Sequence, residues 1–157
     1  MCYLLQIPPD NPAGSPNLKK LLADPGVEKK FHFGRFDMGL LLKTFRVLCR
    51  PVYCTKIASP LTRTFPDRHG LKELCRDLLS VELYKFEQYS DWGTERLTEE
   101  QKRYAATDVL HLHRLRKKLD KMLLQEGRFG LAQACFEFLP RRVELDCACW
   151  EEDIFQH

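Results

Sequence analysis

A tyrosine and an aspartate stand four residues apart in the segment Glu99–Leu115, which reads EEQKRYAATDVLHLHRL. Positions i and i+4 of a helix share a face, so Tyr104 and Asp108 would project side by side, with His111 next along the same face. A carboxylate can hold a hard cation such as Mg²⁺ or Mn²⁺, and a phenol beside it can orient or deprotonate an attacking water. The pair therefore indicates metal-assisted hydrolysis. In the alternative interpretation Tyr104 packs at the edge of the core and Asp108 is solvated.

A second acid, Asp37, follows the predicted strand KKFHFG at the start of a predicted helix. In α/β folds ligand-binding groups gather at the carboxyl ends of strands, and an acid there also suits the positive end of the next helix. Asp37 is thus a second candidate metal ligand. Its alternative role is simple stabilisation of the helix N-terminus.

The connection LYKFEQYSDWGTERLTEEQ precedes the helix that we expect to begin at Thr98. Such a mixture of polar and aromatic residues can bind a nucleotide through base stacking and phosphate contacts. The alternative is a loop held in place by a half-buried tryptophan. The residues that carry this prediction are Lys85, Gln88, Ser90, Asp91 and Trp92.

Taken in this order, the segments resemble the ribonuclease D-like branch of the DEDD 3′–5′ exonucleases, whose last motif is Tyr-x-x-x-Asp. KKFHFGRFDMGLL is similar to the second exonuclease motif, and LTEEQKRYAATDVLHL is similar to the third. The spacer between them, including its Ser-Asp-Trp, is also similar to that of the family. The C-terminal FLPRRVELDCACWEEDIFQH resembles that of the short bacterial members that act as nanoRNases on very short RNA. The resemblance covers nearly all of the chain.

The resemblance implies an α/β, ribonuclease H-like exonuclease fold, with a mixed sheet flanked by helices. It implies one 3′–5′ exonuclease domain over residues 1–157, with a C-terminal helix and tail from about residue 128. The implied reaction is two-metal-ion hydrolysis of phosphodiester bonds at the 3′ end of short RNA, with Mg²⁺ or Mn²⁺. Asp108 and Asp37 become catalytic metal ligands, and Tyr104 orients or activates the attacking water. Self-association into a homo-oligomer is implied by resemblance as well. The expected nucleic-acid-binding residues are His32, Phe33, Arg68, His69, Lys85, Gln88, Ser90 and Trp92.

The first motif of this family, Asp-x-Glu on the first strand, has no counterpart upstream of Asp37, where the acids are Asp10, Asp24 and Glu28. The opening MCYLLQIPPDNP resembles the family's third strand and the loop after it, so we expect a fold truncated at its N-terminus by about two strands. Two carboxylates should not hold two divalent ions near a triply charged transition state, so we expect little or no hydrolysis by this chain as given. A start codon assigned too late, a truncated gene and a pseudoenzyme are all compatible with this pattern.

Two further classes of function stay open. A helical interaction protein would retain its activity after loss of Asp37, Tyr104 and Asp108. A non-catalytic RNA-binding or assembly module would bind RNA in a salt-sensitive way that survives EDTA. Such a module would combine aromatic stacking with the basic residues Arg63, Arg68, His69 and Lys72.

The composition sets broader limits. Hydrophobic residues make up 44% and charged residues 30% of the chain, which is typical of a globular, soluble protein. The net charge of +3 is too small to indicate a nucleic-acid partner by itself. No apolar run approaches the ~20 residues that span a bilayer, so no membrane association is expected. The seven cysteines and the absence of a recognisable signal sequence predict reduced thiols and a cytoplasmic location.

Apolar patterns and turn residues predict the order of the elements. The helix from Thr98 should start with a capping box formed with Gln101, and should run to near Gly127 as the longest helix. Strands are expected at 2–7, 29–34 and 50–55. Helices are expected at 18–24, at 35–45, at 56–65 with an interruption at Pro60, at 69–80, and at 131–139, ending before Pro140.

Overall fold

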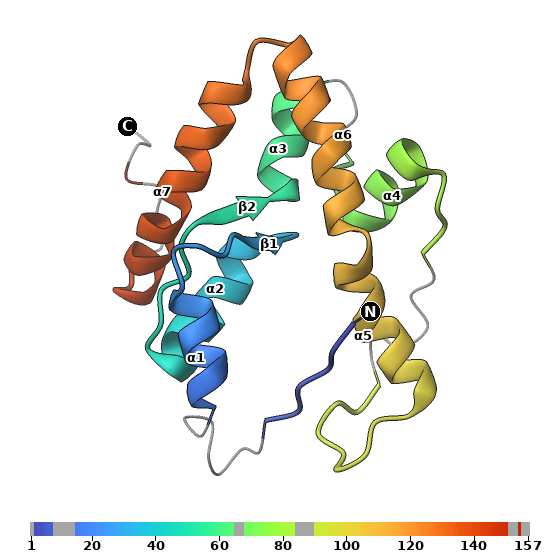
Figure 1. The fold of residues 1–157 in the computed structure, drawn as a ribbon, viewed down its shortest axis with the longest axis vertical. Helices are drawn as coiled ribbons and strands as arrows, with labels where there is room; N and C mark the ends of the chain where they lie inside the picture. Colours follow the sequence, from blue (N-terminus) through green and yellow to red (C-terminus); the bar gives the residue numbers. More distant parts are fainter. Residues whose placement is uncertain (1, 8–14, 65–67, 84–89, 151–153, 155–157) are drawn as a thin grey trace.

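A two-stranded parallel sheet lies at the centre of the computed structural model, which describes residues 2–7, 15–64, 68–83, 90–150 and 154 (Figure 1). Strand β1 (Lys29–Phe31) pairs with β2 (Val52–Cys54), so that Lys29 lies opposite Val52 and Phe31 opposite Cys54. Helix α2 (Gly34–Phe45) provides the crossover that two parallel strands require. The predicted α/β class and these two strands are confirmed.

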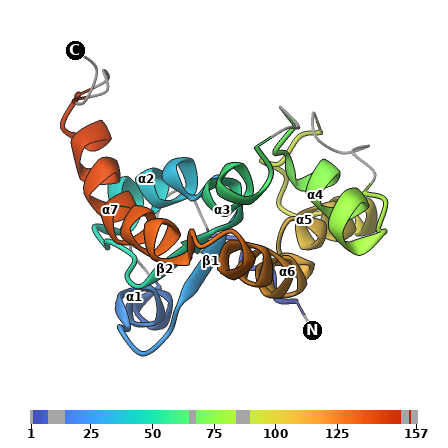
Figure 2. The same cartoon turned by 90° about the horizontal axis from the view of Figure 1, so that it is seen from above.

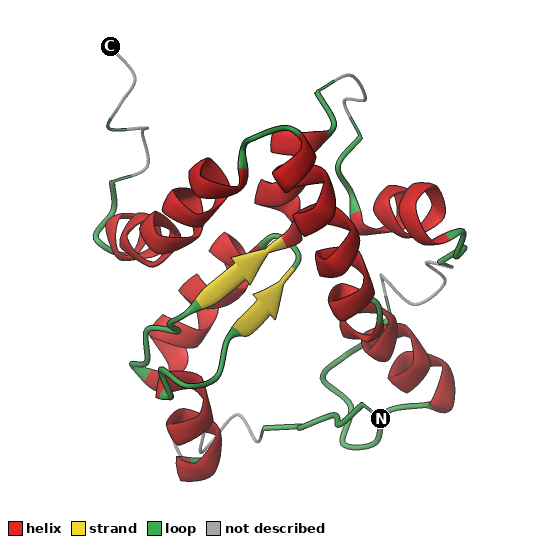
Figure 3. Cartoon of the chain, turned by 45° about the horizontal axis from the view of Figure 1, so that its top comes forward, coloured by secondary structure: helices red, strands yellow, loops and turns green. Residues whose placement is uncertain are grey.

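Among the described residues, six further helices pack around the sheet or against the helices that flank it. In Figure 1, α6 and α7 meet at the top and form an inverted V, with the sheet between their arms, and Figures 2 and 3 show the same arrangement from two other directions. Helix α2 packs against α7, and α3 packs against α6. None of the described helices is both long enough and apolar enough to cross a membrane. The six are α1 (Pro16–Ala23), α3 (Thr55–Thr62), α4 (Leu71–Leu79), α5 (Glu99–Leu110), α6 (Leu112–Gln125) and α7 (Phe129–Cys147).

Regularly spaced leucines on α6 form one part of the core. Leu115, Leu119 and Leu123 recur every four residues, and all three side chains are fully buried. Met38 of α2 and Val143 of α7 belong to the same cluster. Burial of each such side chain contributes roughly 1.5–3 kcal/mol. Helix α6 packs against α3, α4 and α7.

Lys29 fastens the start of β1 by hydrogen bonds to main-chain oxygens. Its side chain is buried, and its ammonium donates to the carbonyls of Asp24, Val27 and Arg50. A buried ammonium is tolerated when its donors are satisfied, as they are here. The contact ties the turn before β1 to Arg50, two residues before the start of β2.

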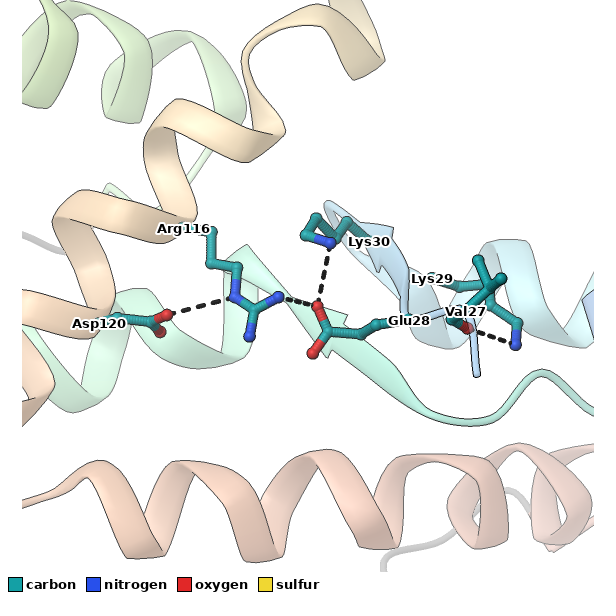
Figure 4. A network of polar contacts seen from close by, with 6 residues as sticks. All are labelled: Val27, Glu28, Lys29, Lys30, Arg116 and Asp120. Carbon is teal, nitrogen blue, oxygen red and sulfur yellow. Dashed lines mark hydrogen bonds and ion pairs between the residues drawn. The ribbon is translucent and has the colours of Figure 1, made fainter. Parts of the chain in front are cut away.

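Arg116 of α6 joins the same region through charged side chains (Figure 4). Its guanidinium donates to the carboxylate of Glu28 and to that of Asp120. Lys30 reaches the same Glu28 carboxylate at 3.1 Å, and the guanidinium also stacks on the ring of Tyr53, 4.9 Å from its centroid. Figure 4 shows Arg116 between the two acids. Through Glu28 and the ring of Tyr53, Arg116 joins α6 to the residue before β1 and to β2.

The predicted strand at residues 2–7 is wrong. The segment has no regular secondary structure, and Tyr3 and Leu5 are 85% and 62% exposed. A strand needs a neighbour to pair its backbone N–H and C=O groups, and within the described residues no strand lies beside this segment or beside the outer edge of β1. The sheet therefore consists of the parallel pair alone in the described part of the chain.

Three helix boundaries also differ from those predicted. The helix that starts after Thr98 breaks at His111, because Val109 and Leu110 are exposed and the buried apolar face begins only at Leu112. Helix α3 extends past Pro60, and α7 continues through Pro140 to Cys147, which makes α7 the longest described helix. Pro140 is itself buried in the packing of α7, which outweighs the one lost backbone hydrogen bond.

Candidate active site

The turn between β1 and α2 determines the position of Asp37. Phe33 adopts a left-handed conformation (φ 65°, ψ 41°), and Gly34 starts the helix. A Cβ atom at position 34 would lie 2.8 Å from the Cβ of Phe31, so a side chain there would clash. This tight turn places Asp37 in the first turn of α2, just beyond the carboxyl end of the sheet, as predicted.

Asp37 and Asp108 lie within electrostatic reach of each other. Asp37 is half-buried on α2, and Asp108 is exposed near the end of α5. Burial of the Asp37 carboxyl raises its pKa, and the negative charge of Asp108 raises it further. In Figure 1 the arrowhead of β1 points toward the side of the molecule occupied by α5 and α6. The fold thus brings together two acids that are far apart in the sequence.

Tyr104 lies one helical turn before Asp108 on α5. Its side chain is half-buried, and its ring is inclined at 45° to that of Trp92, with centroids 5.9 Å apart. The predicted capping box is present: Gln101 N donates to Thr98 Oγ1 at 3.1 Å, and Thr98 N donates to Gln101 Oε1 at 2.9 Å. The start of α5 and the loop before it therefore hold Tyr104 in a defined setting.

Two predicted nucleic-acid-binding residues lie next to the start of α2. The Nδ1 atom of His32 is 2.9 Å from Oγ1 of Thr55, a threonine whose hydroxyl also donates to the Phe31 carbonyl. Phe33 is half exposed, and the ammonium of Lys56 lies 4.6 Å from the centroid of its ring. Lys56 escaped prediction, although its place just after β2 was a usable signal, because the carboxyl ends of parallel strands meet at one edge of a sheet.

The remaining predicted residues fall into separate places. Ser90 and Trp92 lie beside α5, where the side chain of Gln101 donates to Ser90 Oγ at 3.2 Å. His69 is held to α3 through a hydrogen bond of 2.7 Å with Ser59, and Arg68 before it is exposed. Lys85 and Gln88 lie outside the described residues. The structure thus gathers one group at the start of α2 and another along α5, each with one acid.

The two acids fit a divalent cation in their chemistry. Within the described ranges no group of three or more His, Cys, Asp or Glu side chains is arranged so that it could hold a metal ion. Mg²⁺ is commonly bound through one or two carboxylates, with waters and substrate phosphates completing its shell. Burial raises the pKa of Asp37 and the charge of Asp108 adds to this effect, and a cation between the two acids would offset both. The pair can therefore contribute to a metal site that other ligands complete.

Comparison with known proteins identifies the class to which this fold and site belong. The family model described as "3′-5′ exonuclease" matches residues 5–124, which is most of the chain. The chain therefore belongs to this family of 3′–5′ exonucleases.

Individual relatives show which members of the family the chain resembles. A ribonuclease D from Granulibacter bethesdensis is 36% identical over 111 residues, covering 71% of this chain and 28% of that protein. The structure of Brucella melitensis NrnC bound to pGG is 54% identical, with a TM-score of 0.89 over 92% of this chain and 71% of that one. Brucella melitensis NrnC with bound Mg²⁺ is also 54% identical, with a TM-score of 0.86 over 90% of this chain and 69% of that one.

The fold predicted from the family resemblance is confirmed by these neighbours, and so is the ribonuclease D-like assignment. The chain spans only a little over a quarter of the length of the curated ribonuclease D that it matches, 28%. The roles of individual residues stay predictions.

Proposed function

We propose that this chain carries the site of a metal-dependent 3′–5′ exoribonuclease that removes nucleotides from the 3′ end of short RNA. The observation that carries the proposal is the approach of Asp37 to Asp108, with Tyr104 one turn away on the same helix as Asp108. Family membership supplies the class of reaction. The preference for short RNA is supported by the similarity to Brucella melitensis NrnC, whose structure is bound to pGG.

In this proposal Asp37 and Asp108 hold a divalent ion, Mg²⁺ or Mn²⁺, together with water and the scissile phosphate. Such an ion neutralises charge on the phosphate and lowers the pKa of a water molecule. Support for Mg²⁺ comes from the relative solved with bound Mg²⁺. The second ion of a two-metal site would need ligands beyond these two aspartates.

Tyr104 orients the attacking water in this scheme or takes its proton. The water oxygen bonds to phosphorus as the bond to the 3′ oxygen of the preceding nucleotide breaks, and a proton ends on that leaving oxygen. His32, Phe33 and Trp92 are the proposed contacts to the RNA, because each places an aromatic ring beside one of the two helices that carry the acids, α2 or α5. Ser90, Lys85, Gln88, Arg68 and His69 complete the proposed RNA-binding set.

The reducing cytoplasm is the proposed setting. All seven cysteines are free thiols in the structure, which fits a compartment that keeps thiols reduced. Self-association into a homo-oligomer stays a prediction that a light-scattering mass would decide.

The test is cleavage of a 3′-labelled RNA dinucleotide with Mg²⁺ or Mn²⁺ present. The absence of an Asp-x-Glu motif alone would predict little or no hydrolysis, but family membership and the Asp37–Asp108 pair lead us to expect release of the labelled nucleotide. That release should be lost in EDTA and in Asp108→Asn. Cleavage that survives EDTA or persists in Asp108→Asn would contradict the proposal. Salt-sensitive RNA binding without any cleavage would favour the non-catalytic RNA-binding module instead. Asp10→Asn, which changes an acid outside both motifs, is the matched control and should cleave as the wild type does.

A further inference from the structure

Gln101 makes more contacts than a helix cap requires. Its side chain is 5% exposed. The Oε1 atom completes the capping box by accepting from Thr98 N, while Nε2 donates to the Asp91 carbonyl at 2.8 Å and to Ser90 Oγ at 3.2 Å. Both amide hydrogens are therefore used outside the box. A glutamate at this position forms the same box but has no hydrogen to donate to the Asp91 carbonyl.

The loop that Gln101 holds is the one that carries Trp92. Asp91 Oδ1 accepts from Gly93 N at 2.8 Å, which closes the loop into a tight turn around Trp92. The far side of the loop is anchored as well, because Gln6 Nε2 donates to the Thr94 carbonyl at 2.6 Å. Trp92 is 38% exposed and directs its ring toward Tyr104.

Gln101, Tyr104 and Asp108 succeed one another along one face of α5, at spacings of three and four residues. The Gln101 amide fixes the loop at one end of this face, and the loop's Trp92 covers the next residue, Tyr104. Movement of the loop would therefore displace the Tyr104 ring, which lies one helical turn before Asp108.

We infer that Gln101 is a positioning residue, which holds Trp92 against Tyr104 and so fixes the phenol relative to Asp108. The inference rests on the proposed function for its effect on catalysis. Its structural half, that Gln101 holds Trp92, stands on the hydrogen bonds alone. Small displacements of a reacting group can cost about 10²-fold in rate, so loosening of this contact should be visible in turnover.

The decisive variants are Gln101→Glu and Thr98→Ala. Gln101→Glu keeps the cap but replaces the donating amide with a carboxylate that faces the Asp91 carbonyl. Thr98→Ala is the matched control, because it removes the cap hydroxyl and leaves all three Gln101 contacts in place. Both are made in a Trp150→Phe background, which leaves Trp92 as the only tryptophan of the chain.

Two measurements are made on each variant. The first is acrylamide quenching of Trp92 fluorescence, which needs no activity. The second is the kcat and KM for the RNA dinucleotide. We expect Gln101→Glu to raise the quenching constant about twofold and to lower kcat by about 10²-fold, with KM changed much less. Thr98→Ala should lower the melting temperature but leave both readouts near those of the parent.

Unchanged quenching in Gln101→Glu would overturn the inference even if the parent cleaves RNA normally. Raised quenching with unchanged kcat in an active parent would also overturn it, because Trp92 would then not position Tyr104. If the parent does not cleave RNA, the proposed function fails separately. In that case the quenching alone decides whether Gln101 holds Trp92.

Discussion

Asp37 on α2 lies close enough to Asp108 on α5 for the charge of one to alter the ionisation of the other. Asp37 follows the carboxyl end of β1, whereas Asp108 belongs to a helix that lies much further along the sequence. Two carboxylates that repel each other at a shared place cost stability unless a cation joins them. The relationship therefore links stability, pH and metal binding.

Without metal, Asp37 should make the protein less stable as the pH rises. The pKa of Asp37 in the folded protein is raised above its ordinary value of 3.8. The contribution of the neutral Asp37 carboxyl to folding stability is therefore fully present below pH 3.8. It is lost as the pH rises through the raised pKa of Asp37 in the folded state. In EDTA at neutral pH we expect Asp37→Asn to unfold at higher urea concentration than the wild type.

The difference between Asp37→Asn and the wild type should vanish at a pH below 3.8, where both side chains are neutral. Urea unfolding of both proteins across this range measures the effect. Asp24→Asn serves as the control acid. A wild type that is as stable as Asp37→Asn at neutral pH would contradict the expectation.

Mg²⁺ should reverse this penalty. A ligand that binds only the folded state at about 100 times its Kd stabilises it by about 2.7 kcal/mol. We expect added Mg²⁺ to raise the melting temperature of the wild type in a concentration-dependent way. In Asp37→Asn and in Asp108→Asn the rise should be much smaller, because each variant removes one of two proposed ligands. Equal rises in melting temperature in all three proteins would mean that Mg²⁺ binds at another site.

Tyr104→Phe separates chemistry from metal binding. The variant removes only the phenol hydroxyl and keeps the ring that contacts Trp92. If the hydroxyl orients the water or takes its proton, kcat for the RNA dinucleotide should fall by about 10²–10⁴-fold. The Mg²⁺-dependent rise in melting temperature should stay as in the wild type. A kcat close to that of the wild type would remove Tyr104 from the mechanism.

Local patterns predicted the elements that carry the site. The α2 helix, the capping box at Thr98, and the placement of Asp37 after β1 all depend on residues close together in the sequence. The break at His111 depends instead on which residues are buried in the core, since Leu112 is buried and Leu110 is not. Periodicity alone continues through that break, because apolar residues keep a helical spacing on both sides of it.

Contacts between distant segments could not be predicted in the same way. The joint use of Gln101 by the helix cap and by the Ser90–Trp92 loop depends on how the loop folds back. The cap pattern accepts glutamate or glutamine, so it carries no information on the two donated hydrogen bonds. The strand expected at 2–7 failed for a related reason, because a strand is defined by its neighbour and not by its own apolar residues.

Arg116 provides a last prediction, which concerns stability alone. Arg116→Ala would leave the carboxylates of Glu28 and Asp120 without this partner and remove the stacking on Tyr53, all in partly buried positions (Figure 4). Hydrogen bonds to charged groups contribute about 1.5–3 kcal/mol each, so we expect a loss of that order in the free energy of unfolding, measured in urea. Arg141→Ala is the matched control, because Arg141 pairs with Glu144 in an exposed i,i+3 contact and its loss should cost about 0.5 kcal/mol or less. Similar losses in both variants would mean that the Arg116 network contributes no more than a surface ion pair, and that α6 is held to the strands by its leucines alone.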